Sequence, residues 1–203
     1  MCLGPKGREI GGIRMSVNLT KGQGVNLKKE APNLRRLMIG LGWDPVKSFL
    51  GRAIDIDASV ICIDEKGKFL DVVYYGNLTH RSGAIKHMGD NLTGEGDGDD
   101  EQITIDLERL PANIAKCSII INIYSAYSRN QHFGKVRNCF VHADDMDTRK
   151  ELVRYNVDGN FDGLTGIFVA DVYRYNGEWR FKAIGEGVKV ADIKEMVNMK
   201  CKR

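Results

Sequence analysis

The sequence has few of the features that mark secreted, membrane-embedded or thiolate-zinc proteins. Its 203 residues contain five cysteines without a C-x-x-C pair, four prolines and two tryptophans. No apolar run approaches the roughly 18 to 20 residues that cross a bilayer, and residues 1–14 lack the apolar core of a signal peptide. We therefore expect a cytoplasmic protein with reduced cysteines and no direct membrane insertion.

Motifs of the common enzyme classes are also missing. There is no G-x-S-x-G nucleophile elbow, and the four histidines include no H-x-H or H-x-x-x-H pair that would indicate zinc. His87 lies three residues before Asp90, so one alternative makes it a neighbour of the acidic segment, but a surface position is the default for such a histidine. These absences predict that the protein is not an enzyme. The alternative is a calcium-dependent hydrolase, or another enzyme, that uses the carboxylates described below.

Charge is unevenly distributed along the chain. The formal net charge is +3, from 30 basic and 27 acidic residues. Residues 90–101 hold six acids and no base, which leaves 30 basic against 21 acidic residues elsewhere, a net charge of +9. No basic run alternates with aromatic residues as a nucleic-acid-binding surface would usually show. The sequence thus predicts no nucleic-acid partner.

Short strand-like runs recur along the chain, and helical periodicity is almost absent. Asn176 and Gly177 separate two such runs and suit a type I′ turn, because both residues tolerate positive φ. Only residues 189–200 have apolar residues at helical spacing. The predicted fold class is all-β: a two-sheet β-sandwich with a short C-terminal helix. Strands are expected near residues 16–20, 24–29, 35–42, 53–64, 68–75, 101–107, 116–126, 136–143, 150–156, 166–175 and 178–184.

The ordered pattern begins at Met15, so residues 1–14 are expected to be an extension that is disordered or non-native. Residues 15–203 are long enough for one well-buried core. No linker or internal repeat divides them. We therefore expect 15–203 to form a single β-sandwich domain.

The segment 89–101, GDNLTGEGDGDDE, has the composition of a calcium site. Calcium takes roughly six to eight oxygen ligands from carboxylates, amides and backbone carbonyls, and the segment offers all three kinds. Glycines at every second position give the backbone freedom to turn these oxygens inward. The segment does not fit an EF-hand, because Glu95 stands where the sixth-position glycine belongs. The alternative is a solvated acidic turn.

A second pair of carboxylates lies on the strand expected near 53–64. Period-two alternation places Asp55, Asp57 and Ser59 on the face opposite Ile54 and Ile56. Adjacent carboxylates on one strand face repel each other and favour a shared cation. Alone, this pattern more often means solvated acids at a sheet edge. Beside the acidic segment, it becomes a second ligand set.

Four separated motifs resemble the TerD family of tellurium-resistance and stress proteins. The resemblance runs from about Met15 to about Gly187. It implies a calcium-binding β-sandwich associated with resistance to tellurite, other chemical stress and phage. It also implies that the protein acts with other Ter-type stress proteins, some of them membrane-associated. The motifs are Gly40-Leu41-Gly42-Trp43-Asp44, Asp55-Ile56-Asp57-Ala58-Ser59, the acidic segment 90–101 and residues 129–138 (RNQHFGKVRN).

By motif position, the resemblance implies two calcium ions and a defined ligand set. Residues 129–138 leave two interpretations open. Their side chains either satisfy buried backbone groups, or they border the calcium segment and form a partner surface. The implied metal ligands are Asp55, Asp57, Asp90, Asn91, Thr93, Gly94, Asp99, Asp100 and Glu101.

Overall fold

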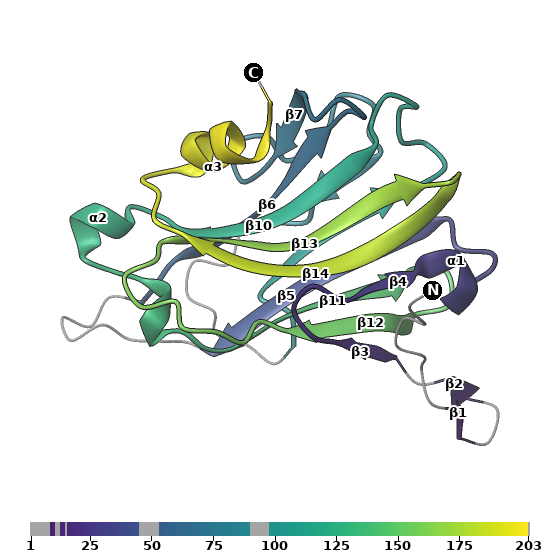
Figure 1. Cartoon of the computed structure of the whole chain (residues 1–203), viewed down its shortest axis with the longest axis horizontal. Coiled ribbons are helices and arrows are strands. Elements are labelled where there is room, and N and C mark those ends of the chain that lie inside the picture. Colours follow the sequence, from purple (N-terminus) through teal and green to yellow (C-terminus); the bar gives the residue numbers. More distant parts are fainter. Residues whose placement is uncertain (1–8, 11–12, 15, 45–52, 90–97, 203) are drawn as a thin grey trace.

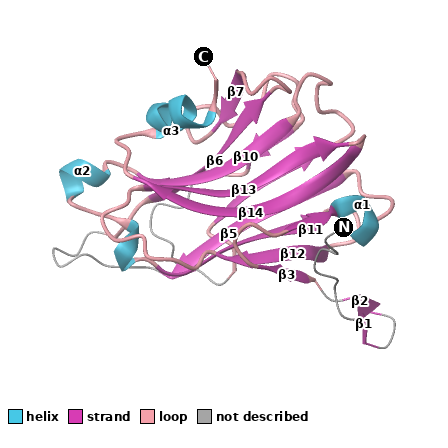
Figure 2. Ribbon diagram, in the orientation of Figure 1, coloured by secondary structure: helices cyan, strands magenta, loops and turns pink. Residues whose placement is uncertain are grey.

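The computed structural model describes residues 9–10, 13–14, 16–44, 53–89 and 98–202. It contains two six-stranded sheets that lie face to face (Figures 1 and 2). Sheet I has the order β4-β14-β13-β10-β6-β7, and sheet II has the order β3-β12-β11-β5-β9-β8. The predicted class, an all-β two-sheet sandwich with a short C-terminal helix, is confirmed.

Sheet I consists of β4 (Gly24–Asn26), β14 (Glu178–Val188), β13 (Gly166–Tyr175), β10 (Lys116–Ile123), β6 (Ile56–Ile63) and β7 (Phe69–Val73). Sheet II consists of β3 (Val17–Leu19), β12 (Lys150–Asn156), β11 (Arg137–Asp145), β5 (Arg36–Asp44), β9 (Glu101–Asp106) and β8 (Ile85–His87). The helical elements are α1 (Leu27–Glu30), α2 (Ala126–Arg129), the 3₁₀ turn η1 (Phe133–Lys135) and α3 (Ile193–Lys200).

Alternation along β5 and β6 fixes which residues face the core. Ile39 and Leu41 of β5 and Ala58 and Val60 of β6 are all buried between the sheets. Successive side chains of a strand point to opposite faces, so Gly40 on β5 lies on the outer face of sheet II. The same alternation determines which face of each sheet carries the polar side chains of the candidate site.

The hairpin between β13 and β14 forms as predicted. Tyr175 and Glu178 are register partners, and the turn residues Asn176 and Gly177 have φ values of +51° and +75°. Positive φ at both central residues is the signature of a type I′ turn.

Several predicted strands are shorter than expected, among them 53–64 (Ile56–Ile63) and 68–75 (Phe69–Val73), and two others are followed by a helical turn. The strand expected at 24–29 ends at Asn26, whose Oδ1 accepts a hydrogen bond from Lys28 N at 3.0 Å and caps α1. The strand expected at 116–126 ends at Ile123, shortly before α2. Sequence reasoning missed β8, a strand of three residues.

Part of the segment 1–14 is also described. Glu9–Ile10 (β1) and Ile13–Arg14 (β2) form a two-stranded sheet of their own. This small sheet is separate from sheets I and II. The other residues of the expected extension lie outside the described residues.

Helix α3 covers the outer face of sheet I, beside β6 and β10 (Figure 1). Asp192 caps it by accepting a hydrogen bond from Glu195 N at 3.0 Å. Met196 is fully buried and packs in one cluster with Ile61, Ile120 and Phe168. The predicted C-terminal helix is therefore confirmed, although it begins at Ile193 rather than near residue 189.

Replacing the buried methionine of α3 tests how firmly the helix is held. We expect Met196→Ala to lower the free energy of unfolding by about 2–5 kcal/mol, because it removes a buried side chain and leaves a cavity. Met199→Ala is the matched control, since Met199 lies on the same helix with 59% of its surface exposed. Urea unfolding should separate the two variants, and equal midpoints would contradict the docking of α3.

Candidate functional site

The carboxylates of Asp55 and Asp57 are buried. Their exposed fractions are 8% and 3%, and β6 is an internal strand between β10 and β7. Arg129 Nη1 contacts Asp55 Oδ2 at 3.2 Å, and Asn122 Nδ2 donates to Asp57 Oδ2 at 3.4 Å. The interpretation as solvated acids at a sheet edge is therefore wrong for this pair. Buried carboxylates require compensating donors or cations.

Glu101 joins the end of the acidic segment to β6 in the opposite sheet. Its Oε2 accepts a hydrogen bond from Ala58 N at 2.6 Å, and the residue is only 2% exposed. His87 Nε2 lies 3.3 Å from the same oxygen and 3.2 Å from Ala58 O. His87 is thus buried, and its predicted surface position is wrong. The acidic segment ends beside the strand that holds Asp57.

Asp99 and Asp100 make different contacts. Asp100 N donates to Leu41 O at 2.8 Å, and Asp100 Oδ2 accepts from Trp43 N at 2.7 Å, so Asp100 is bonded along β5. Asp99 lies over the outer face of sheet II. There its carboxylate accepts from Gln102 Nε2 at 3.0 Å and pairs with His142 Nε2 at 2.6 Å.

Electrostatics hold Asp99 and His142 in their charged forms. Burial opposes the charge of His142, but hydrogen bonds to Asp144 and Asp99 outweigh it and raise the pKa of His142 to about 9. Burial likewise opposes ionisation of Asp99, but the bonds from His142 and Gln102 lower the pKa of Asp99 below its usual value. Burial raises the pKa of Asp100, and the backbone bond from Trp43 offsets this only in part.

Two glycines of β5 make room for these contacts. A Cβ at Gly40 would overlap both His142 Nε2 and the Asp99 carboxylate. A Cβ at Gly42 would overlap the Phe140 ring and come within 3.0 Å of Gly98 O. The glycines of the predicted Gly40-Leu41-Gly42-Trp43-Asp44 motif therefore let residues 98–99 and β11 lie close against the outer face of β5.

The structure describes five of the nine predicted ligands. Asp55, Asp57, Asp99, Asp100 and Glu101 have the positions given above. Asp90, Asn91, Thr93 and Gly94 lie outside the described residues.

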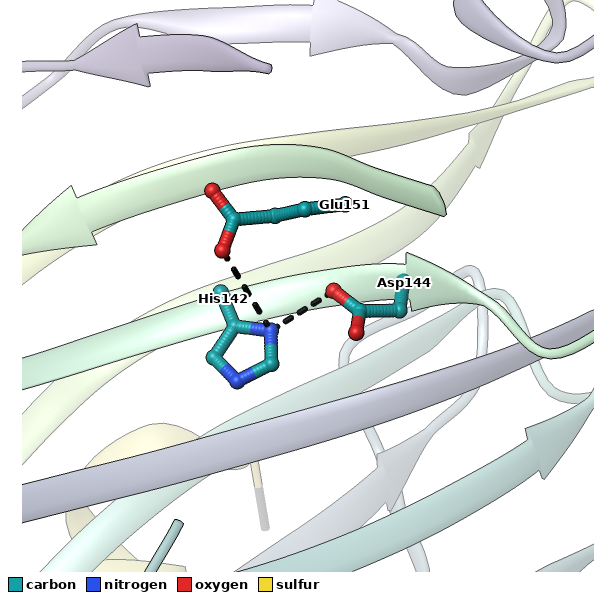
Figure 3. A group of neighbouring side chains, drawn as sticks. All are labelled: His142, Asp144 and Glu151. Atoms are coloured by element: carbon teal, nitrogen blue, oxygen red, sulfur yellow. Dashed lines mark hydrogen bonds and ion pairs between the residues drawn. The ribbon is translucent and has the colours of Figure 1, made fainter. Parts of the chain in front are cut away.

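A different group converges instead. Within the described parts of the chain, one group of three metal-ligating side chains has its ligand atoms within 4.8 Å of one another: His142, Asp144 and Glu151 (Figure 3). Sequence reasoning did not place these residues together. Asp144 and Glu151 become neighbours only through the register of β11 and β12, which local spacing does not reveal.

Both interpretations of residues 129–138 find contacts that support them. Gln131 Nε2 donates to Ala53 O at 3.1 Å, and Arg137 Nη1 donates to Gly134 O at 3.1 Å. The bond from Gln131 satisfies a part-buried backbone carbonyl, whereas the bond from Arg137 is exposed. Arg129, by contrast, pairs with Asp55 and therefore borders a predicted calcium ligand.

Together these features define a β-sandwich in which Asp99, Asp100 and Glu101, at the end of the acidic segment, bond to both sheets. Among the described residues, no helix has the length and apolar character needed to span a membrane.

Comparison with known proteins agrees with the resemblance seen in the sequence. The TerD domain matches residues 15–199, and the chain belongs to the TerD family.

Several relatives cover most of the chain. Stress response protein SCP2 of Bacillus subtilis is 43% identical over 197 residues, covering 91% of this chain and 98% of the relative. Tellurium resistance protein TerD of Serratia marcescens is 40% identical over 176 residues, covering 85% and 91%. A solved structure of a TerD homologue from Streptomyces coelicolor superposes with a TM-score of 0.67 over 84% of this chain and 100% of the other. At 24% identity, that structure supports the fold alone.

The raised pKa of His142 predicts a pH dependence of stability. Its folded pKa, about 9, lies above the usual 6.5. The stability contributed by His142 should therefore be complete below pH 6.5 and be lost as the pH rises through 9. Urea unfolding of chelator-treated protein between pH 6 and 10 measures this loss. His142→Gln should flatten this part of the profile, while the control His132→Gln keeps it. An unchanged profile in His142→Gln would contradict the assignment.

The role of Gly40 can be tested by adding one methyl group. We expect Gly40→Ala to lower the free energy of unfolding by about 1–3 kcal/mol, the usual cost of overpacking. Adding His142→Ala removes one overlapping partner, so the double variant should be more stable than the sum of the single effects predicts. Additive effects in a denaturant double-mutant cycle would show that Gly40 and His142 do not share this space.

Proposed function

We propose that the chain is a calcium-binding, non-enzymatic stress-response protein of the tellurite and chemical-stress resistance type. Calcium, taken up as two ions, orders the acidic segment 90–101 together with Asp55 and Asp57. The ordered segment then supports binding of other Ter-type stress proteins in the cytoplasm, some of them membrane-associated.

The observation that carries the proposal is the bond between Glu101 and Ala58 N, which ties the acidic segment to β6, the strand that contains Asp57 and directly follows Asp55. Both aspartates are buried, so their repulsion is little screened by water. The atoms in this region that could bind a metal are carboxylate oxygens, supplemented by backbone carbonyl oxygens. That chemistry suits calcium better than a soft metal.

The relatives support the stress-response part of the proposal. Their names refer to stress response, general stress and tellurium resistance, which favours a resistance protein over an enzyme. The family membership extends this expectation to the present chain.

Calorimetric titration of chelator-treated protein tests calcium binding. We expect saturable, calcium-selective binding with magnesium as the control ion. Asp55→Asn/Asp57→Asn should weaken calcium binding about tenfold or more, because it removes two charges from the site. Glu65→Gln/Glu186→Gln changes the net charge equally at two exposed positions and should leave the affinity unchanged.

Two results would contradict calcium binding at this site. One is the absence of saturable binding to the wild type. The other is equal affinity in the Asp55/Asp57 double variant and its control.

The partner-binding step needs a separate measurement. Sedimentation of the protein with a purified Ter-type protein from the same organism should show tighter association with calcium than with chelator. If calcium raises the melting temperature but leaves the association constant unchanged, the ion is structural only.

A further inference from the structure

A second group of metal-ligating side chains lies on the outer face of sheet II, at the neighbouring strands β11 and β12. Figure 3 shows the His142 ring with the carboxylates of Asp144 and Glu151 beside it. His142 Nδ1 lies 2.7 Å from Asp144 Oδ1 and 3.9 Å from Glu151 Oε2. An imidazole nitrogen thus faces two carboxylate oxygens on a rigid part of the sandwich.

Asp99 orients the imidazole for ligation through Nδ1. It bonds to Nε2, the opposite ring nitrogen, at 2.6 Å. A metal binding at Nδ1 displaces the Nδ1 proton to solvent, and the carboxylate that accepts from Nε2–H then holds the neutral ring with Nδ1 toward the metal, as in carboxylate–histidine–zinc arrangements. The cluster is therefore more than a set of acids, because a buried histidine is held with Nδ1 toward Asp144 and Glu151.

The spacing suits a divalent ion that prefers nitrogen and oxygen ligands. In tetrahedral geometry, bonds of about 2.0–2.2 Å place neighbouring ligand atoms roughly 3.4 Å apart. The distances from Nδ1 to the two carboxylates, 2.7 and 3.9 Å, fall on either side of this value. Small rotations of Asp144 and Glu151 would therefore close the group around one ion.

Arg154 already binds Glu151, one of the three proposed ligands. It donates to Glu151 through Nε and Nη2 at 3.1 and 2.8 Å, and its guanidinium lies 4.5 Å from the centre of the Phe140 ring. This cation competes with a metal for Glu151. The competition gives a test, because loss of Arg154 should strengthen metal binding.

We propose that His142, Asp144 and Glu151 form a binding site for a divalent transition-metal ion of the zinc class, adjacent to the calcium-binding segment and in contact with it through Asp99. His142 supplies Nδ1 and the two acids supply one oxygen each, while Asp99 positions the ring. Three protein ligands leave a coordination position for water or for a group from a partner.

Zinc titration by calorimetry, with and without calcium, tests the proposal. The full chain should carry Cys2→Ser and Cys201→Ser, which removes two thiols that compete for zinc. We expect one zinc site. Asp144→Asn and Glu151→Gln should each weaken it about tenfold or more, at least as much as loss of an outer-shell partner does. Arg154→Gln should tighten it about threefold or more, since a nearby positive charge is removed.

His132→Gln is the matched control, because His132 Nδ1 also faces a carboxylate, that of Asp162, at 3.2 Å. It should leave zinc affinity unchanged. Zinc affinity that survives in Asp144→Asn and Glu151→Gln would overturn the proposal. So would zinc binding that disappears in Asp55→Asn/Asp57→Asn alone, because zinc would then occupy the calcium site.

Spectroscopy of the wild-type protein tests the zinc site even if a variant does not fold. Zinc should shift the ¹⁵N resonance of His142 Nδ1 more than that of His132, and cobalt should give visible bands of a nitrogen- and oxygen-ligated ion. No shift at His142 would overturn the zinc site. The calcium proposal is judged by the calcium titration alone, so either one can fail without the other.

Discussion

A buried carboxylate must find a donor or a cation, because removing its charge from water without compensation costs several kcal/mol. This requirement organises the acidic end of the sandwich. Glu101 accepts a hydrogen bond from the N–H of Ala58 in the opposite sheet, and Asp100 accepts one from the N–H of Trp43. Asp99 bonds to the side chains of Gln102 and His142. Without these donors, the segment that follows residue 97 could not lie against both sheets.

The three successive acids therefore couple parts of the protein that are far apart in sequence. Glu101 reaches sheet I between the layers, whereas Asp99 reaches the outer face of sheet II. A change in the charge of the preceding segment would act on both sheets through these bonds. Through this coupling, an ion bound at the proposed calcium site would affect the stability of the whole sandwich, and not only local order.

Much of the fold could be predicted from local patterns. Alternation identified the two faces of β6, and Asn176-Gly177 identified the hairpin, because both signals depend on neighbours in sequence. The burial of Asp55 could not be predicted, since it depends on where β6 lies within its sheet. The same holds for the group around His142, which exists only because the register of β11 and β12 places its members together. Local spacing contains no information about such register.

The glycines of β5 also affect how sequences of this kind should be compared. Position 40 requires glycine, because His142 and Asp99 occupy the space that a side chain would need. Its identity is therefore a property of a pair of strands rather than of β5 alone. A relative with a smaller residue at the position of His142 would be under weaker selection to keep glycine at position 40, and the two positions should change together over evolution. Alignments that score each column separately would overlook this dependence.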